Sequence, residues 1–127
     1  MAKRQLPEPT EGELAILNVL WDKGPMTVRR VHDALRDDGA RYTTTLKQMQ
    51  VMAEKGLLRR DDSRKSHVYS AVIKESDTKQ TLVAGVIDRV FDGSVQKMML
   101  HALQARDVDD QEIRELKRLL NARGKGK

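Results

Sequence analysis

The segment from Arg41 to Tyr69 constrains the fold of this chain more than any other stretch. It starts with a cluster of threonines, continues as a helical pattern that stops at Gly56, and ends as two apolar runs around a polar turn. A glycine after a helical pattern is typical of a helix C-terminus, and alternating runs around a polar turn are typical of a β-hairpin. The segment is therefore predicted to form a helix over 43–55, a strand over 57–60, a turn over 61–66 and a strand over 68–72.

Most of the net positive charge of the chain lies in the same segment. Its seven basic and three acidic side chains contribute +4 of the formal net charge of +5. Positive charge gathered on one helix and one hairpin is the electrostatic pattern of a protein that binds the phosphate backbone of nucleic acid. The basic residues are Arg41, Lys47, Lys55, Arg59, Arg60, Arg64 and Lys65.

The composition limits the size and the class of the protein. With 127 residues, 39% of them apolar, the chain is expected to form one small domain, or a small domain with an appendage. It contains no cysteine, which excludes disulfides and thiolate metal sites and favours a cytoplasmic protein. It has no run of about 18 apolar residues and no apolar stretch behind its first basic residues, so neither a membrane span nor a signal peptide is expected.

Two helices are predicted before the central segment. Thr10 and Glu13 have the spacing of a capping box, and apolar residues follow at helical spacing until Gly24 and Pro25. A second helix is predicted over 28–38. Three helices followed by a hairpin predict a mainly α fold, a winged helix-turn-helix whose wing is the hairpin. Residues 1–74 are predicted to form this DNA-binding domain.

The third predicted helix has one apolar side and one polar side. At about 100° per residue, Thr45, Met49 and Met52 fall on the inner side, while hydroxyl and ammonium groups fall on the outer side. Such groups bond base edges and phosphates in a major groove, and an outward valine contacts a thymine methyl. An ordinary solvated helix face is the alternative, and the basic hairpin next to it favours DNA. The predicted DNA-contacting residues are Arg41, Tyr42, Thr43, Thr44, Lys47, Gln48 and Val51 on the helix, and Arg64, Lys65, Ser66 and His67 on the hairpin.

Residues 75–127 are predicted to be a helical dimerisation region with a disordered basic tail from Arg123. Its three helices are more apolar than a core of their own requires; the first is predicted to be capped by Ser76, the second to run from Ser94 to Ala105, and the third to be capped by Asp109. A second copy of the same region buries these faces in a C2 dimer, and packing onto the N-terminal domain in a monomer is the alternative. The predicted dimerisation residues are Leu82, Val86, Val90, Phe91, Met98, Met99, Leu103, Ile113, Leu116 and Leu120.

Short motifs spread along the chain resemble the BlaI/MecI family of bacterial winged-helix regulators, the penicillinase and methicillin-resistance repressors. Each motif is weak alone, but their order and spacing are specific together, and they cover nearly the whole chain. The motifs are E-x-x-I-L-x-V-L-W from Glu13, V-x-x-V-x-x-A-L from Val28, Y-T-T from Tyr42, E-K-G-L-L from Glu54, R-K-S-H-V-Y from Arg64 and D-x-x-E-I-x-E-L-x-x-L-L from Asp109.

The resemblance implies a homodimeric repressor that binds a palindromic DNA operator. In members that respond to β-lactams, a membrane sensor triggers proteolysis in the dimerisation region, typically at an Asn-Phe bond. This chain departs from that pattern and carries His101-Ala102 at that place, which leaves open whether it is released by proteolysis. By position these residues are the candidate proteolytic site, and a regulatory protease or sensor is the partner that the resemblance implies. A copper-responsive branch uses C-terminal cysteines, which this chain lacks. The resemblance implies no cofactor and no metal.

Other classes of function fit the residues less well. His32, His67 and His101 are far apart, and Ser66 and His67 are neighbours on a predicted strand, where they point to opposite faces. An enzyme is therefore not predicted, and the spacing does not favour a metal-responsive regulator with histidine and carboxylate ligands. A winged-helix module that binds protein and a regulator that responds to a small molecule remain open alternatives.

Overall fold

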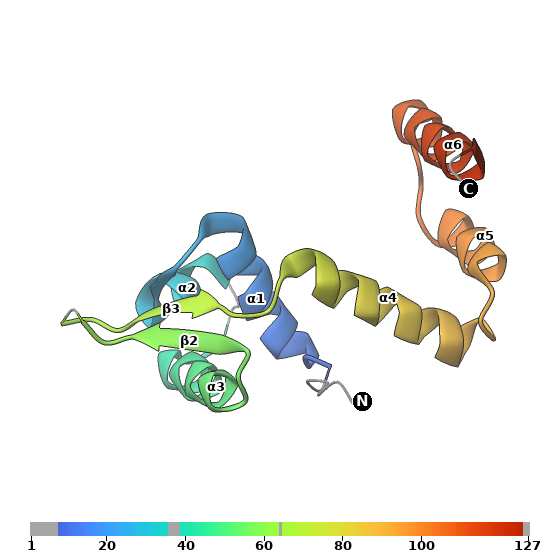
Figure 1. The fold of residues 1–127 in the computed structure, drawn as a ribbon. Helices are drawn as coiled ribbons and strands as arrows, with labels where there is room; N and C mark the ends of the chain where they lie inside the picture. The colour runs from blue at the N-terminus through green and yellow to red at the C-terminus, as the bar shows by residue number, and fades with distance from the viewer. Residues whose placement is uncertain (1–7, 36–38, 64, 126–127) are drawn as a thin grey trace. The chain divides into compact units, whose positions relative to one another are not determined.

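The computed structural model describes residues 8–35, 39–63 and 65–125, which form six helices and three short strands (Figure 1). The fold is mainly α, as the sequence predicts. In chain order the elements are α1 (Glu11–Lys23), β1 (Met26–Thr27), α2 (Val28–Leu35), α3 (Tyr42–Glu54), β2 (Leu58–Asp61), β3 (Val68–Ala71), α4 (Glu75–Val90), α5 (Val95–Ala105) and α6 (Asp110–Lys125).

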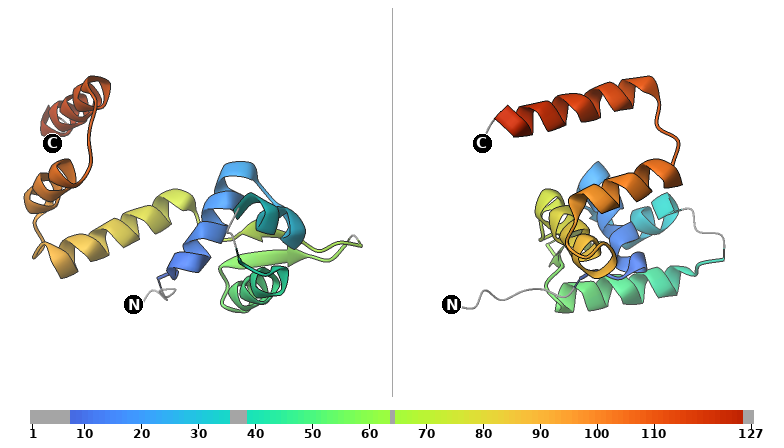
Figure 2. Two further views of the ribbon diagram at one scale, coloured as in Figure 1. Left: turned by 180° about the vertical axis from the view of Figure 1, so that it is seen from behind. Right: turned by 90° about the vertical axis from the view of Figure 1, so that its right-hand side faces the viewer.

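The three strands form one antiparallel sheet in the order β1-β3-β2. In the central strand, Tyr69 pairs with Met26 on one side and with Arg60 on the other. The β2–β3 hairpin confirms the predicted wing, and it extends beyond the neighbouring helices in Figure 1 and in the left view of Figure 2. The two-residue strand β1 was not predicted, because a stretch that short has no alternating pattern.

The ends of the first two helices are set by local hydrogen bonds. The Thr10 hydroxyl accepts from the amide of Glu13 at 3.2 Å, and the Glu13 carboxylate accepts from the amide of Thr10 at 3.0 Å, which confirms the predicted capping box. Gly24 ends α1 at φ +91°, a conformation that favours glycine. Thr27 caps α2 by accepting from the amide of Arg30 at 3.3 Å. The second helix was predicted to extend to residue 38, and residues 36–38 lie outside the described part of the chain.

One apolar cluster holds the three helices and the sheet together. Helix α3 contributes the side that its helical spacing placed inward, with Thr45, Met49 and Met52 all buried. Burying one large apolar side chain contributes about 1.5–3 kcal/mol, so the cluster is the main source of stability here. Its buried members are Ile16, Leu17, Leu20, Val28, Val31, Met49, Met52, Leu57, Leu58 and Tyr69.

The start of α4 belongs to the same unit as this core. The indole Nε1 of Trp21 donates to the backbone carbonyl of Ile73 at 3.1 Å, and Thr78 is buried one turn into α4. The ammonium of Lys79 lies 5.7 Å from the centroid of the Trp21 ring. The chain divides into two compact units between Leu82 and Val83, within α4.

The second unit contains the rest of α4 together with α5 and α6. Asp109 caps α6 by accepting from the amide of Glu112 at 2.8 Å, as predicted. Ser94 caps α5 by accepting from the amide of Lys97 at 3.0 Å. The cap predicted at Ser76 is wrong, because that residue lies inside the first turn of α4 and its hydroxyl accepts from Gln80.

The tail predicted to be disordered from Arg123 is also corrected in part. Helix α6 continues through Lys125, since each residue added to an existing helix gains a backbone hydrogen bond.

Candidate nucleic-acid interface

The outer face of α3 is polar and open to solvent. Thr43, Thr44 and Lys47 are exposed in its first two turns, followed by Gln50 and Glu54. Val51, which the helical spacing also placed outward, is half-buried. Helix α3 runs beside β2, so this face adjoins the base of the wing (Figure 1). The face offers hydroxyl, ammonium and amide groups at the spacing of successive turns of one helix.

Gln48 lies on the flank of α3 that faces α1. It is half-buried, and a Cβ placed on Gly12 would come within 2.6 Å of its Nε2 atom. The side-chain amide therefore occupies the space that a larger residue at position 12 would need. The contact places Gln48 beside the first turn of α1, at the edge of the outer face.

The C-terminal end of α3 is tied to α1 by a buried carboxylate. Lys55 Nζ lies 2.6 Å from Glu13 Oε2, and only 4% of Glu13 is exposed. Burial acts to raise the pKa of Glu13, but hydrogen bonds from Lys55 and from the backbone of Thr10 outweigh it, and the pKa lies below its ordinary value. Glu13 is therefore charged at neutral pH, and Lys55 neutralises it instead of facing solvent as a free cation.

A carboxylate on the wing holds two basic side chains. Asp62 Oδ1 lies 2.7 Å from Arg60 Nε and 2.8 Å from His67 Nδ1. Asp61 Oδ1 accepts from the amide of Ser63 at 2.9 Å and shapes the turn. These contacts fix the described part of the turn, and they engage His67, which the sequence predicts to contact DNA.

The basic segment therefore has fewer free cations than its formal charge indicates. Lys55 and Arg60 are paired within the chain, and Arg64 lies outside the described residues. Four other basic side chains are exposed and make no ion pair with any described residue. They are Arg41 at the start of α3, Lys47 on its outer face, Arg59 on β2 and Lys65 on the turn, where Ser66 is exposed as well.

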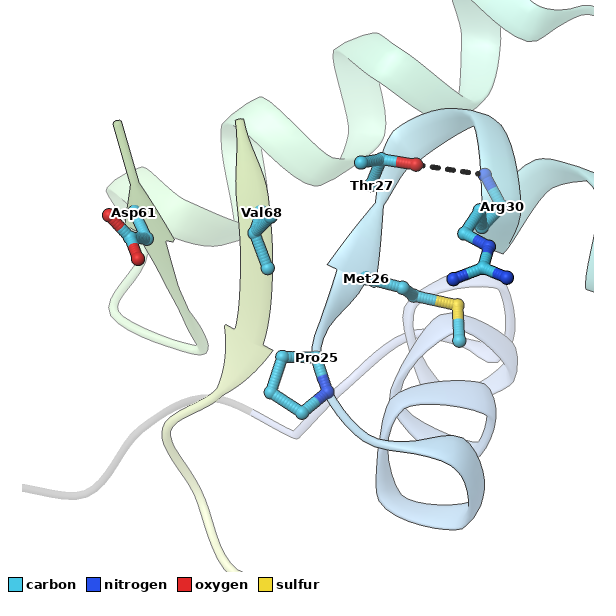
Figure 3. Close-up of a pocket in the computed structure, with 6 residues that line it drawn as sticks. All are labelled: Pro25, Met26, Thr27, Arg30, Asp61 and Val68. Atoms are coloured by element: carbon cyan, nitrogen blue, oxygen red, sulfur yellow. Dashed lines mark hydrogen bonds between the residues drawn. The ribbon is translucent and has the colours of Figure 1, made fainter. Parts of the chain in front are cut away.

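A cavity of about 320 Å³ lies beside β1 and the start of α2 (Figure 3). Its two charged lining residues do not converge, because Arg30 and Asp61 stand on opposite sides of Val68 in the close-up. Small-molecule sites usually combine an apolar wall with a few convergent polar groups. The cavity therefore does not favour the small-molecule alternative. Its lining residues are Pro25, Met26, Thr27, Arg30, Asp61 and Val68.

The described residues offer no arrangement for metal binding or for crossing a membrane. Within the ranges that the structure covers, no three His, Asp or Glu side chains are grouped as metal ligands. His32 and His101 stand on α2 and α5, and His67 precedes β3. In the same ranges, no helix is both long and apolar enough to span a membrane.

Three helices, a β-hairpin wing and an exposed polar face on the third helix define a winged helix-turn-helix protein. A comparison with family models agrees, since the penicillinase repressor model matches residues 9–122. The chain belongs to this family, whose members are transcriptional repressors and not enzymes. This confirms the resemblance found in the sequence.

Curated relatives match most of the chain at low identity. The methicillin resistance regulatory protein MecI of Mammaliicoccus sciuri is 25% identical over 117 residues, which cover 90% of this chain and 94% of the relative. The penicillinase repressor of Bacillus licheniformis is 24% identical over 118 residues, 92% of each chain. The transcriptional regulator BlaI of Mycobacterium tuberculosis is 31% identical over 102 residues, covering 77% of this chain and 73% of the relative.

Proposed function

We propose that this chain represses transcription by binding a palindromic DNA operator as a homodimer, with α3 in the major groove and the wing on the backbone. Family membership supports the repressor role. The observation that carries the DNA-binding mode is the exposed face of Thr43, Thr44 and Lys47, with free cations on the wing beside it. Base-edge contacts select the sequence, and phosphate contacts set the register of the protein on the duplex.

Within this proposal the residues of the interface have different roles. Thr43, Thr44, Lys47 and Gln48 bond base edges, and Val51 contacts a thymine methyl. Gln48 reaches a base by leaving its position beside Gly12, which a flexible side chain does at low cost. The residues assigned to the backbone are Arg41 and Tyr42 at the start of α3, and Arg64, Lys65, Ser66 and His67 on the wing.

The proposed dimer is formed by residues 75–127, while residues 1–74 bind DNA. Val90 and Leu120 are about two-thirds exposed, at 65% and 67%, and Val86, Leu103 and Ile113 are exposed as well. The other residues of the predicted interface, Leu82, Phe91, Met98, Met99 and Leu116, are half-buried. An apolar set this large on short helices is stabilised when a second copy covers it.

Proteolytic release at His101-Ala102 stays a prediction. Both residues are exposed in the middle of α5, and the His101 ring packs against that of Phe91 with centroids 5.5 Å apart. A protease or sensor that cuts there interrupts the same region that we assign to dimerisation.

Selection of bound sequences from random DNA tests the proposed function directly. The expected result is an inverted repeat whose half-sites are separated by about one helical turn or a multiple of it, because two α3 helices then meet the same side of the duplex. Binding that depends on salt but recovers no sequence motif contradicts the proposal.

A further inference from the structure

The first turn of α3, which carries Thr43 and Thr44, has no capping side chain. Arg41 occupies the N-cap position and makes no side-chain hydrogen bond there; only its backbone carbonyl accepts, from the amides of Thr44 and Thr45 at 3.0 and 3.2 Å. Helix starts are usually secured by Ser, Thr, Asp or Asn at this position. The turn that presents the reading hydroxyls therefore depends on contacts from outside α3.

Helix α2 supplies a hydrogen bond to this turn. His32 Nδ1 lies 2.9 Å from the hydroxyl oxygen of Thr45, and Thr45 is only 3% exposed. A buried hydroxyl needs a partner, so this bond fixes where Thr45 sits against α2. The imidazole of His32 also meets the ring of Tyr42 edge-on, with centroids 5.9 Å apart and planes at 85°.

Arg29 holds the same aromatic ring through a second contact. Its guanidinium carbon lies 4.2 Å from the centroid of the Tyr42 ring, which is within the range of a cation–π interaction. Arg29 and His32 are three residues apart on α2, so they project from neighbouring turns of one face. Tyr42, the first residue of α3, is therefore held by both side chains.

We propose that Arg29 and His32 are positioning residues that act through Tyr42 and Thr45 to set how sharply α3 discriminates between DNA sequences. The proposal rests on the proposed function, and it adds two residues that do not themselves read bases. Base reading needs side chains held close to their productive geometry, whereas phosphate binding tolerates small displacements. Loosening the first turn therefore lowers operator affinity more than affinity for unrelated DNA.

The test compares full-length variants on the selected operator and on an unrelated duplex of equal length. Arg29→Ala and His32→Ala should each reduce the ratio of the two affinities roughly three- to tenfold, the range expected for one such contact. Arg30→Ala is the matched control, because it removes the same charge from the same helix. It should weaken binding to both duplexes equally and leave the ratio unchanged.

Two further measurements separate positioning from a loss of folding. In a double-mutant cycle of Arg29→Ala with Tyr42→Leu, the double variant should lose little beyond Tyr42→Leu alone, because the contact that Arg29→Ala removes is already absent from that variant. His32→Asn keeps a hydrogen-bonding group near Nδ1 and should restore part of the ratio that His32→Ala loses.

The outcomes distinguish this proposal from the function on which it rests. If the wild-type chain prefers an operator but Arg29→Ala and His32→Ala keep its affinity ratio, the positioning role is overturned and the repressor function stands. If the wild-type chain shows no preference for any sequence, the proposed function fails and the positioning role fails with it. Additive losses in the double-mutant cycle also overturn the role of Arg29.

Discussion

The two units of this chain use apolar side chains in opposite ways. The described residues of the first unit, up to Leu82, bury ten of them in one cluster around α1, α2, α3 and the sheet. In the described part of the second unit, from Val83 onward, no side chain reaches full burial, and valines and leucines of α4, α5 and α6 face solvent. The first unit therefore has a core of its own, whereas the second leaves its apolar side chains exposed, as expected if they form the dimer interface that we propose.

A charged residue on the exposed apolar surface is the strongest way to test this difference. We expect Leu103→Glu to convert a two-chain assembly into single chains, because a carboxylate is costly to bury without a partner. Operator affinity should then fall roughly 10²- to 10⁴-fold, about 3–5 kcal/mol, as bivalent binding is lost. Analytical ultracentrifugation and a mobility-shift titration measure the two effects.

The neighbouring Gln104→Glu is the control for that substitution. Gln104 is exposed on the same turn of α5, and its replacement adds the same charge outside the predicted interface. It should leave both the assembly and the affinity unchanged. A wild-type chain that is monomeric at micromolar concentration contradicts the proposal that a second copy covers the apolar surface of the second unit.

Truncation of a core leucine tests the other side of the comparison. Leu17→Ala should lower the free energy of unfolding by about 2–5 kcal/mol at every protein concentration, because it leaves a cavity in the first unit. Leu120→Ala makes the same chemical change in the second unit, and its effect on the free energy of unfolding should shrink on dilution, because a side chain buried only in the dimer contributes nothing once the chains separate. Urea denaturation at two protein concentrations separates the two effects. If the losses in the two variants depend on concentration in the same way, the proposed difference between the two units is contradicted.

Removal of Lys47 tests whether the first unit reads the DNA sequence through the outer face of α3. Lys47→Ala should weaken operator binding by about 1–3 kcal/mol while affinity for unrelated DNA changes little, if Lys47 bonds a base edge. Lys65→Ala on the wing should weaken binding to all sequences equally. It should also make the slope of log affinity against log salt concentration shallower by about 0.9 for each phosphate that the protein no longer neutralises. Titrations at two salt concentrations measure both, and the assembly state should not change.

The buried ion pair gives the smallest expected effect and a defined pH dependence. Because the pKa of Glu13 is lower in the folded chain, its contribution to stability is present above the ordinary glutamate value of 4.5 and is lost as pH falls through the folded pKa. Glu13→Gln should therefore cost about 1–2 kcal/mol at neutral pH and progressively less below that value.

Denaturation curves at several pH values follow this loss. Glu11→Gln changes an exposed residue in the same helical turn and serves as the control, with a small effect at each pH. A cost of Glu13→Gln that stays constant down to about pH 3, below the ordinary range for a glutamate, contradicts the assigned role of the carboxylate.

Features set by local sequence were predictable, and features set by distant contacts were not. The caps at Thr10 and Asp109 and the buried side of α3 follow from spacing within one helix, and each is found in the structure. The wing hairpin follows from two short alternating runs around a turn.

The missed features join residues that are far apart along the chain. The Glu13–Lys55 pair spans 42 positions, and Gln48 packs against Gly12 on another helix. The sequence places Lys55 in the positive charge of the basic segment and predicts that Gln48 contacts DNA. Neither contact could be foreseen, because no pattern in a single sequence shows which side chain meets a distant partner. The contact of Arg29 with Tyr42 was not predicted for the same reason.

The chain carries a built-in optical probe, because Trp21 is its sole tryptophan. The indole is hydrogen-bonded to the carbonyl of Ile73, just before α4, and lies near the ammonium of Lys79. Emission from an indole shifts with the polarity around it, so its wavelength reports how the start of α4 is seated on the winged helix. Unlabelled protein can therefore be titrated with DNA while the emission wavelength of Trp21 is followed. A shift on binding shows that operator binding changes the environment at the start of α4, the helix that continues into the second unit.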